Sequence, residues 1–311
     1  MKARIYNMGV TVTDIVNVFH LKVLSYGPEE EEITLIESNR SGLQLSGFYD
    51  HFEEKRIQLI GNAENAYLQS LSSSERLQAL ENLISKSVPC IIITNGLNVS
   101  GKIEELGVKY GRWILSTTNT TSKIWVDITL YLQSELAESI SQHGDLVDVY
   151  GVGVLITGES GIGKSETALD LIRRGHLLVA DDAVIIKKIG QDLLVGTGSE
   201  LTKNLMEIRG VGIININSLF GKSAIRLQQN IEIVMNLEEW NENTYYDRVG
   251  DAYETTQILG IELPYLQIPV KPGRNIAAIV EIAALNYRQN LMGYNAATEL
   301  SNAIKKLSTT K

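Results

Sequence analysis

Short apolar runs alternate with amphipathic stretches along the first 130 residues of the chain. Residues 57–60 and 91–94 are mainly apolar, and turn-forming residues follow each run, which predicts two buried strands. Between them, residues 74–86 carry leucines at three-residue spacing, the pattern of one face of a helix. This alternation predicts a small α/β domain over residues 1–130.

An apolar side chain recurs at every fourth position from Ile128 to Ile140. This stripe predicts a helix that ends near Gly144, and we place the boundary between two domains close to its start. Two apolar runs between residues 146 and 157 then predict a pair of strands. We therefore expect a second α/β domain over residues 131–311.

Two helices are predicted at the end of the chain. Apolar residues at helical spacing between Ile276 and Leu291 mark the first one, which Gly293 ends. Asn295 is expected to cap the second, which runs to about Leu307.

Composition indicates an ordinary globular protein and excludes several other classes. The 311 residues exceed the usual size of a single core, and the formal net charge of -9 disfavours binding to nucleic acid or an anionic membrane. The sequence contains no apolar run of about 18 residues, so no membrane-spanning helix is predicted. The single cysteine, Cys90, cannot form an internal disulfide. We expect a cytoplasmic protein that binds neither nucleic acid nor membrane.

A phosphate-binding loop follows the second of the two strands predicted between residues 146 and 157. Its residues fit the pattern G-x-x-x-x-G-K-[ST] and are Gly158, Glu159, Ser160, Gly161, Ile162, Gly163, Lys164 and Ser165. The glycines let backbone N–H groups curl around phosphate oxygens, and the helix predicted next points its positive end at the same anion. Lys164 is expected to reach the β- and γ-phosphates of ATP, and Ser165 to bind Mg²⁺.

Two adjacent acids, Asp181 and Asp182, interrupt an apolar run from Leu177 to Ile186. Adjacent residues of a strand point to opposite faces, and burying an unpaired carboxylate is costly. Because a phosphate loop lies one helix upstream, one acid can serve Mg²⁺ while the other accepts a proton from an attacking hydroxyl. The alternative is a corner between a strand and a turn, with both acids in water.

Four segments resemble the HPr kinase/phosphorylase family, in the family's order. They are residues 143–165, LIRRGHLLVADD at 171–182, EIRGVGIIN at 207–215 and IPVKPGRN at 268–275. The resemblance implies ATP-dependent phosphorylation of a serine of HPr, the phosphocarrier of the bacterial sugar phosphotransferase system. It also implies removal of that phosphate by inorganic phosphate, which releases pyrophosphate, in carbon catabolite regulation.

The same resemblance implies an architecture. The second domain is expected to be a P-loop kinase domain like that of phosphoenolpyruvate carboxykinase. The first domain is expected to serve regulation or assembly, and the whole chain to form a homo-hexamer.

Functional positions of the family carry over to individual residues of this chain. Asp182 matches the group that accepts a proton in phosphorylation and returns it in the reverse reaction, and Lys164 matches the phosphate contact. Ser165 and Glu207 match the Mg²⁺ positions, and Asp181 is expected to support the metal or its waters. Matches to other active-site positions are His143 and Arg248, and a loop important for dephosphorylation is formed by Pro269, Val270, Lys271, Pro272, Gly273 and Arg274.

Taken singly, His143, Glu207 and Arg248 are ordinary structural or surface residues, and only the combined pattern assigns them a role. The chain also departs from the family, with Glu at position 159 where Asp is usual and Asp at position 145 where an apolar residue is usual. Two other functions stay open. The protein could be a kinase of another substrate, or a nucleotide-binding regulatory module without turnover.

Overall fold

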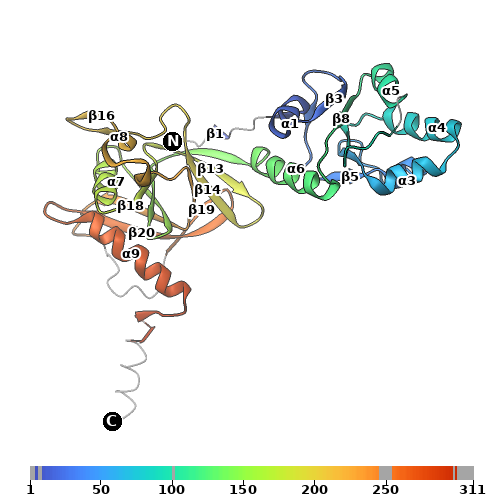
Figure 1. Cartoon of the computed structure of the whole chain (residues 1–311). Coiled ribbons are helices and arrows are strands. Elements are labelled where there is room, and N and C mark those ends of the chain that lie inside the picture. Colours follow the sequence, from blue (N-terminus) through green and yellow to red (C-terminus); the bar gives the residue numbers. More distant parts are fainter. Residues whose placement is uncertain (1–3, 6–8, 100–101, 245–253, 297, 300–311) are drawn as a thin grey trace, which may run out of the picture. The chain divides into compact units, whose positions relative to one another are not determined.

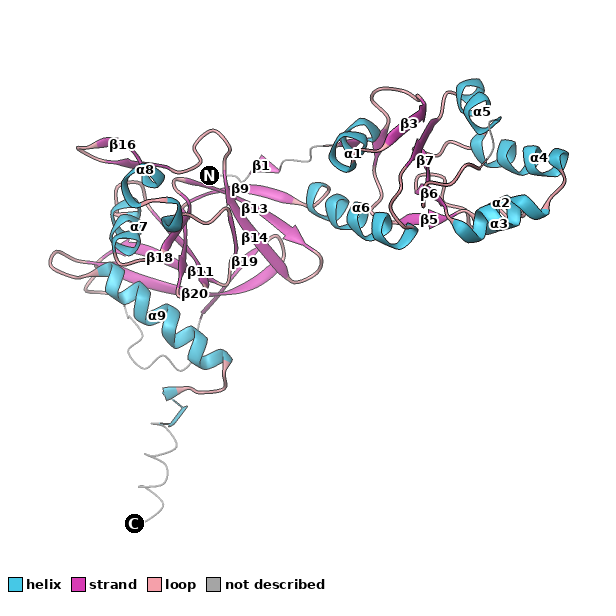
Figure 2. Cartoon of the chain, viewed as in Figure 1, coloured by secondary structure: helices cyan, strands magenta, loops and turns pink. Residues whose placement is uncertain are grey.

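The computed structural model describes residues 4–5, 9–99, 102–244, 254–296 and 298–299 (Figure 1). Contacts divide the chain into two compact units, residues 7–137 and residues 138–311 together with 1–6. Both units combine helices with a central sheet, so the predicted α/β class is confirmed for each (Figure 2). No helix among the described residues combines the length and the apolar character needed to cross a membrane.

The unit of residues 7–137 is a three-layer α/β/α sandwich. Its sheet has the order β3(Lys22–Ser25), β8(Trp113–Ser116), β7(Cys90–Ile93), β6(Ile57–Ile60) and β5(Ser38–Arg40), and all strands except β3 run parallel. One face packs on α1(Val12–Phe19) and α6(Thr121–Glu135), and the other on α3(Asn62–Ser70), α4(Ser73–Ile84) and α5(Lys102–Tyr110). Short elements complete it: α2(Gly42–Leu45) and the pair β2(Val10–Thr11) and β4(Glu32–Ile33).

Alternation along the strands explains the two cores of this unit. In β7, Cys90 and Ile92 face one helical layer while Ile91 and Ile93 face the other, because successive side chains of a strand point to opposite faces. All four are buried, which explains why β7 is a continuous apolar run in the sequence.

The second unit is built on a six-stranded sheet. Its order is β12(Leu177–Ala180), β10(Asp145–Val149), β11(Val152–Gly158), β18(Ile233–Glu239), β20(Ile261–Val270) and β19(Glu254–Ile258), with β11, β18 and β20 parallel. Helices α7(Lys164–Arg173) and α9(Ile276–Leu291) cover one face. The other face packs on a second sheet of β1(Arg4–Ile5), β9(Ser139–His143), β13(Ala183–Ile189), β14(Leu193–Gly198) and β17(Gln228–Asn230).

Three smaller elements of this unit follow the phosphate loop in the sequence: a hairpin, a short helix and a 3-10 turn. The hairpin of β15(Leu205–Ile208) and β16(Gly212–Asn215) carries Glu207. It leads into α8(Ile216–Phe220) and a 3-10 turn, η1(Lys222–Ala224).

Two sequence-based expectations are wrong. The helix predicted from Ile128 to Gly144 ends at Glu135, and residues Ser139–His143 form β9, which pairs with β13. Asp181 and Asp182 do not lie within a strand but at the corner between β12 and β13. Most of the final helix predicted after Asn295 falls outside the described residues.

Candidate active site

The phosphate loop connects β11 to α7, in the strand–loop–helix order that its motif requires. Gly158, Gly161 and Gly163 have φ angles of 142°, 88° and 104°. A Cβ on Gly158 would lie 2.4 Å from the Leu237 carbonyl oxygen, so only glycine fits there. Gly163 ends the loop as the N-cap of α7, which directs the helix N-terminus and its free N–H groups into the loop.

Lys164 is the anchor of this loop. Its side chain is buried, and Nζ donates hydrogen bonds to the carbonyl oxygens of Gly158 (3.1 Å) and Glu159 (3.0 Å). The ammonium group therefore lies inside the curl of the loop, where it can offer its positive charge to a phosphate. Ser165, the next residue, lines the same pocket.

The corner that carries the two acids is held by three consecutive residues, 143–145, at the junction of β9 and β10. Gly144 N–H donates to the Asp182 carbonyl oxygen at 3.0 Å, and Asp145 Oδ1 accepts the Asp182 N–H at 3.0 Å. Both the backbone N–H and the backbone carbonyl of Asp182 are thus held by hydrogen bonds. Asp182 needs this support because its φ of 65° is left-handed, a conformation that costs about 1 kcal/mol or more outside glycine.

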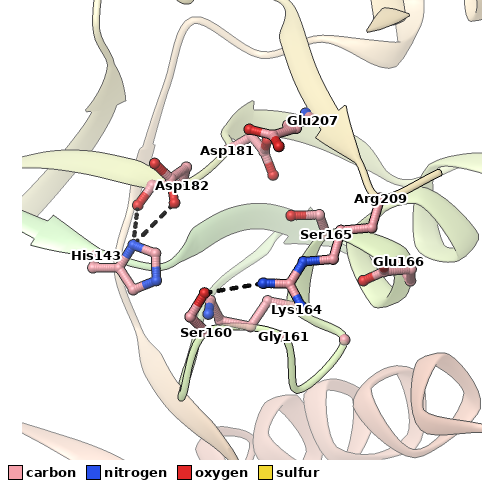
Figure 3. Close-up of a pocket in the computed structure, with 11 residues that line it drawn as sticks. His143, Ser160, Gly161, Lys164, Ser165, Glu166, Asp181, Asp182, Glu207 and Arg209 are labelled. Carbon is pink, nitrogen blue, oxygen red and sulfur yellow. Dashed lines mark hydrogen bonds and ion pairs between the residues drawn. The ribbon is translucent and has the colours of Figure 1, made fainter. Parts of the chain in front are cut away.

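His143 directs the Asp182 carboxylate toward the pocket. Its Nδ1 lies 3.0 Å from Asp182 Oδ1 and 2.8 Å from the Asp182 carbonyl oxygen (Figure 3). Both partners are acceptors, so Nδ1 carries the hydrogen. The Asp182 side chain remains 75% exposed, which leaves its second oxygen open to an incoming hydroxyl.

Asp181 points into the other part of the pocket, beside Glu207 and opposite the phosphate loop (Figure 3). Its Oδ2 accepts the Glu207 N–H at 3.0 Å, and the Ser165 hydroxyl is a further neighbour. Burial raises the pKa of Asp181, although the Glu207 N–H and the Ser165 hydroxyl partly oppose that rise. The acids therefore differ: Asp181 is half-buried, and Asp182 is in water.

Oxygen atoms from Ser165, Asp181 and Glu207 suit a hard divalent cation such as Mg²⁺. Asp181 Oδ1 is buried and has no hydrogen-bond donor, which is the kind of orphaned atom that a cation satisfies. Within the described ranges, no three His, Cys, Asp or Glu side chains are arranged to hold a metal by themselves. A cation here needs hydroxyl, water or phosphate oxygens as well, which is how Mg²⁺ is usually bound.

Asp145 lies behind this pair of acids and is fully buried. Burial raises its pKa to about 8, and the neighbouring charge of Asp181 contributes to the rise. Its Oδ2, like Asp181 Oδ1, has no hydrogen-bond donor. The position was noticeable in the sequence only as an acid among apolar residues, and no role was expected for it.

Comparison with known proteins identifies the family. Residues 134–304 match the family model described as HPr Serine kinase C-terminal domain, and residues 10–132 match HPr Serine kinase N terminus. The chain belongs to the HPr kinase/phosphorylase family. The HPr kinase/phosphorylase of Caldanaerobacter subterraneus subsp. tengcongensis is 44% identical over 298 residues, covering 96% of this chain and 98% of the relative.

A further relative agrees. The HPr kinase/phosphorylase of Alkaliphilus metalliredigens is 47% identical over 274 residues, covering 88% of this chain and 89% of its own. A solved structure, the Hpr(Ser) kinase/phosphatase from Coxiella burnetii, is 34% identical with a TM-score of 0.47 and covers 51% of this chain and 97% of its own.

The structure brings most of the predicted site residues together. One pocket is lined by His143, Ser160, Gly161, Gly163, Lys164, Ser165, Asp181, Asp182 and Glu207. Arg248 lies outside the described residues. The predicted dephosphorylation loop spans the end of β20 and the turn before α9 and does not line this pocket. Its Gly273 and Arg274 instead border a neighbouring hollow beside Glu166, which lines both.

Arg209 was included in the sequence-based prediction only as part of the segment at 207–215, with no role of its own. The structure places its side chain in the pocket. Its Nη2 donates to Ser160 Oγ at 3.3 Å, so its guanidinium lies over the tip of the phosphate loop (Figure 3). A Cβ on Gly161 would lie 2.4 Å from Arg209 Nη1, so a larger residue there would displace the guanidinium. No spacing in the sequence indicates this contact, because it depends on how the β15–β16 hairpin folds back.

Proposed function

We propose that this protein transfers the γ-phosphoryl group of ATP to a serine of HPr, and reverses the transfer with inorganic phosphate in the control of carbon use. The observation that supports this best is the His143–Asp182 pair in one pocket with the phosphate-loop residues Lys164 and Ser165. A phosphate anchor and an open carboxylate in one pocket are the two parts that phosphoryl transfer to a hydroxyl requires.

In the forward direction, the loop N–H groups and Lys164 hold the phosphates of ATP. The seryl oxygen of HPr forms its bond to the γ-phosphorus as the bond to the bridging oxygen of ADP breaks. Asp182 accepts the seryl proton, and His143 keeps that carboxylate in place through Nδ1–H. Arg209, above the loop tip, adds positive charge near the transferring group.

Ser165, Asp181 and Glu207 are the residues that we propose to hold Mg²⁺. When bound, this ion neutralises charge on the phosphate oxygens during transfer. Of the three, the half-buried Asp181 is best suited to bind the ion, because the Glu207 N–H fixes its carboxylate.

In the reverse direction, an oxygen of inorganic phosphate attacks the phosphorus of phosphoserine, and pyrophosphate forms. The seryl oxygen leaves and takes a proton from Asp182, which now acts as the acid. We propose that the loop of residues 269–274 serves this direction. Arg274 braces it by donating to the Pro269 carbonyl oxygen at 3.0 Å, and Lys271 lies 5.3 Å from the Trp240 ring centre.

The remaining parts of the proposal concern architecture. We propose that the second unit is a P-loop kinase domain of the phosphoenolpyruvate carboxykinase type. The first unit is proposed to serve regulation or assembly in a cytoplasmic homo-hexamer.

The decisive experiment is the intact mass of HPr after incubation with the protein, Mg²⁺ and ATP, followed by excess inorganic phosphate. We expect one phosphate to be added and then lost, with pyrophosphate appearing. Asp182→Asn should bind nucleotide but lose about 100-fold or more of the rate in both directions, because one carboxylate serves both. Asp192→Asn, an exposed acid on the β13–β14 turn, is the matched control and should retain the parent rate.

Failure to modify HPr by protein that binds ATP would contradict the proposal. Turnover of a small metabolite instead would identify a kinase of another substrate, and nucleotide binding without any transfer would identify a regulatory module.

A further inference from the structure

An unexplained feature of the pocket is the second buried acid behind Asp181. Asp145 is on β10, fully buried, and only one of its two oxygens has a donor, the Asp182 N–H. A buried carboxylate oxygen without a donor is costly unless the group is protonated or a cation is present. The nearby Lys164 ammonium is already engaged by two carbonyl oxygens of the phosphate loop.

The two orphaned oxygens belong to neighbouring side chains. The charges of Asp145 and Asp181 act on each other, and neither Asp145 Oδ2 nor Asp181 Oδ1 has a hydrogen-bond donor. Two ionised carboxylates so close would repel each other in a site with little water, so without a cation they cannot both carry a charge at low cost. That arrangement becomes favourable when one divalent cation contacts both.

A hard divalent cation prefers oxygen ligands and is often held by one or two carboxylates together with other oxygens. Asp145 and Asp181 would each offer one unpartnered carboxylate oxygen to such an ion. The Ser165 hydroxyl, which neighbours Asp181, is available as a third ligand, and water or phosphate oxygens can supply the rest.

We propose that Asp145 is an additional residue of the divalent-cation site, which pairs with Asp181 so that the site binds the ion before nucleotide arrives. The inference rests on the proposed Mg²⁺-dependent transfer. It reaches further, because a site with the buried Asp145 and the half-buried Asp181 does not depend on phosphate oxygens for its negative charge. The same residue also orders the Asp182 peptide, which links the metal side of the pocket to the proton-accepting side.

The test measures Mn²⁺ binding to the nucleotide-free, full-length protein by electron paramagnetic resonance. Asp145→Asn keeps the shape of the side chain and an acceptor for the Asp182 N–H, but it removes one carboxylate. We expect about tenfold weaker Mn²⁺ binding in this variant. Circular dichroism confirms that the variant is folded.

The matched control is Asp148→Asn. Asp148 is buried on the same strand, but it accepts the Gly151 N–H and pairs with Arg226, away from the pocket. It should leave Mn²⁺ affinity within about twofold of the parent. Equal affinity in Asp145→Asn and the parent, or no Mn²⁺ binding by the parent without nucleotide, overturns the inference. Neither outcome bears on whether HPr is phosphorylated with ATP present, so the two proposals can fail separately.

Discussion

Replacing Asp145 by Asn should make the second unit more stable at neutral pH in the absence of divalent cations. Burial, with the Asp181 charge beside it, raises the Asp145 pKa from 3.8 to about 8. The folded chain therefore keeps a proton that the unfolded chain loses above about pH 4. The stability of the folded state falls as the pH rises from about 4 to about 8, and it changes no further above that range.

The size of the effect follows from the same shift. Each pH unit inside this window changes the free energy of unfolding by about 1.4 kcal/mol, so the parent should lose about 3 kcal/mol between pH 5 and pH 7. The Asn variant lacks the ionisable group, and its amide can donate to the orphaned Asp181 Oδ1. Its stability should therefore be flatter with pH and higher than that of the parent at pH 7.

Hydrogen exchange read by mass spectrometry suits a chain of two units, because it reports local unfolding energies. Peptides of β10 and β11 report on the second unit, and peptides of β6 and β7 in the first unit serve as the internal reference. After correction for intrinsic exchange, protection of β10 and β11 should decline with pH in the parent and decline less steeply in Asp145→Asn, where the raised pKa of Asp181 remains. Equal slopes, or a less stable variant at pH 7, would refute the reasoning.

Three further predictions concern other parts of the second unit. Glu281→Gln should destabilise it by about 1 kcal/mol near neutral pH in urea unfolding, because buried His176 loses its charged partner at 2.9 Å. The His176 contact lowers the Glu281 pKa, so this difference should close in acid as the parent carboxylate protonates. Gly153→Ala should cost about 3 kcal/mol or more, measured as a lower melting temperature, because its Cβ would lie 1.7 Å from the Asn230 carbonyl oxygen. Lys164→Ala should weaken ATP binding in calorimetry by about tenfold or more, and an unchanged affinity would contradict its anchoring role.

Strands and helices with a single strong period were predictable from the sequence. The buried strands β6 and β7 and the helix α9 lie where their patterns predicted, within a residue or so. The apolar stripe from Ile128 to Ile140 gave a wrong prediction of one helix, because the four-residue spacing continues from α6 into β9. Ile128 and Leu132 pack inside the first unit, whereas Ile140 belongs to β9 and packs in the second. Pairing of β9 with β13 overrides the local pattern, and no local period records it.

The phosphate loop could be predicted because all its chemistry lies within eight consecutive residues. The acid pair could be recognised because burying a carboxylate in an apolar run is costly, but its geometry could not be predicted. The expected strand would have sent Asp181 and Asp182 to opposite faces. The left-handed φ of Asp182 instead turns a corner, which places Asp181 toward Glu207 and Asp182 toward His143.

That corner also explains why Asp145 escaped prediction. Its partners Asp181 and Asp182 are more than 35 residues away in the chain, and β10 meets β12 only after a register shift between Leu146 and Val147. A strained backbone persists only where surrounding contacts over-determine it. Here three consecutive residues supply those contacts, and one of them, His143, also contacts the Asp182 carboxylate. The left-handed Asp182 backbone, the buried Asp145 side chain and the His143–Asp182 contact therefore meet at one corner, and we expect a change at position 145 to alter metal binding and local stability together.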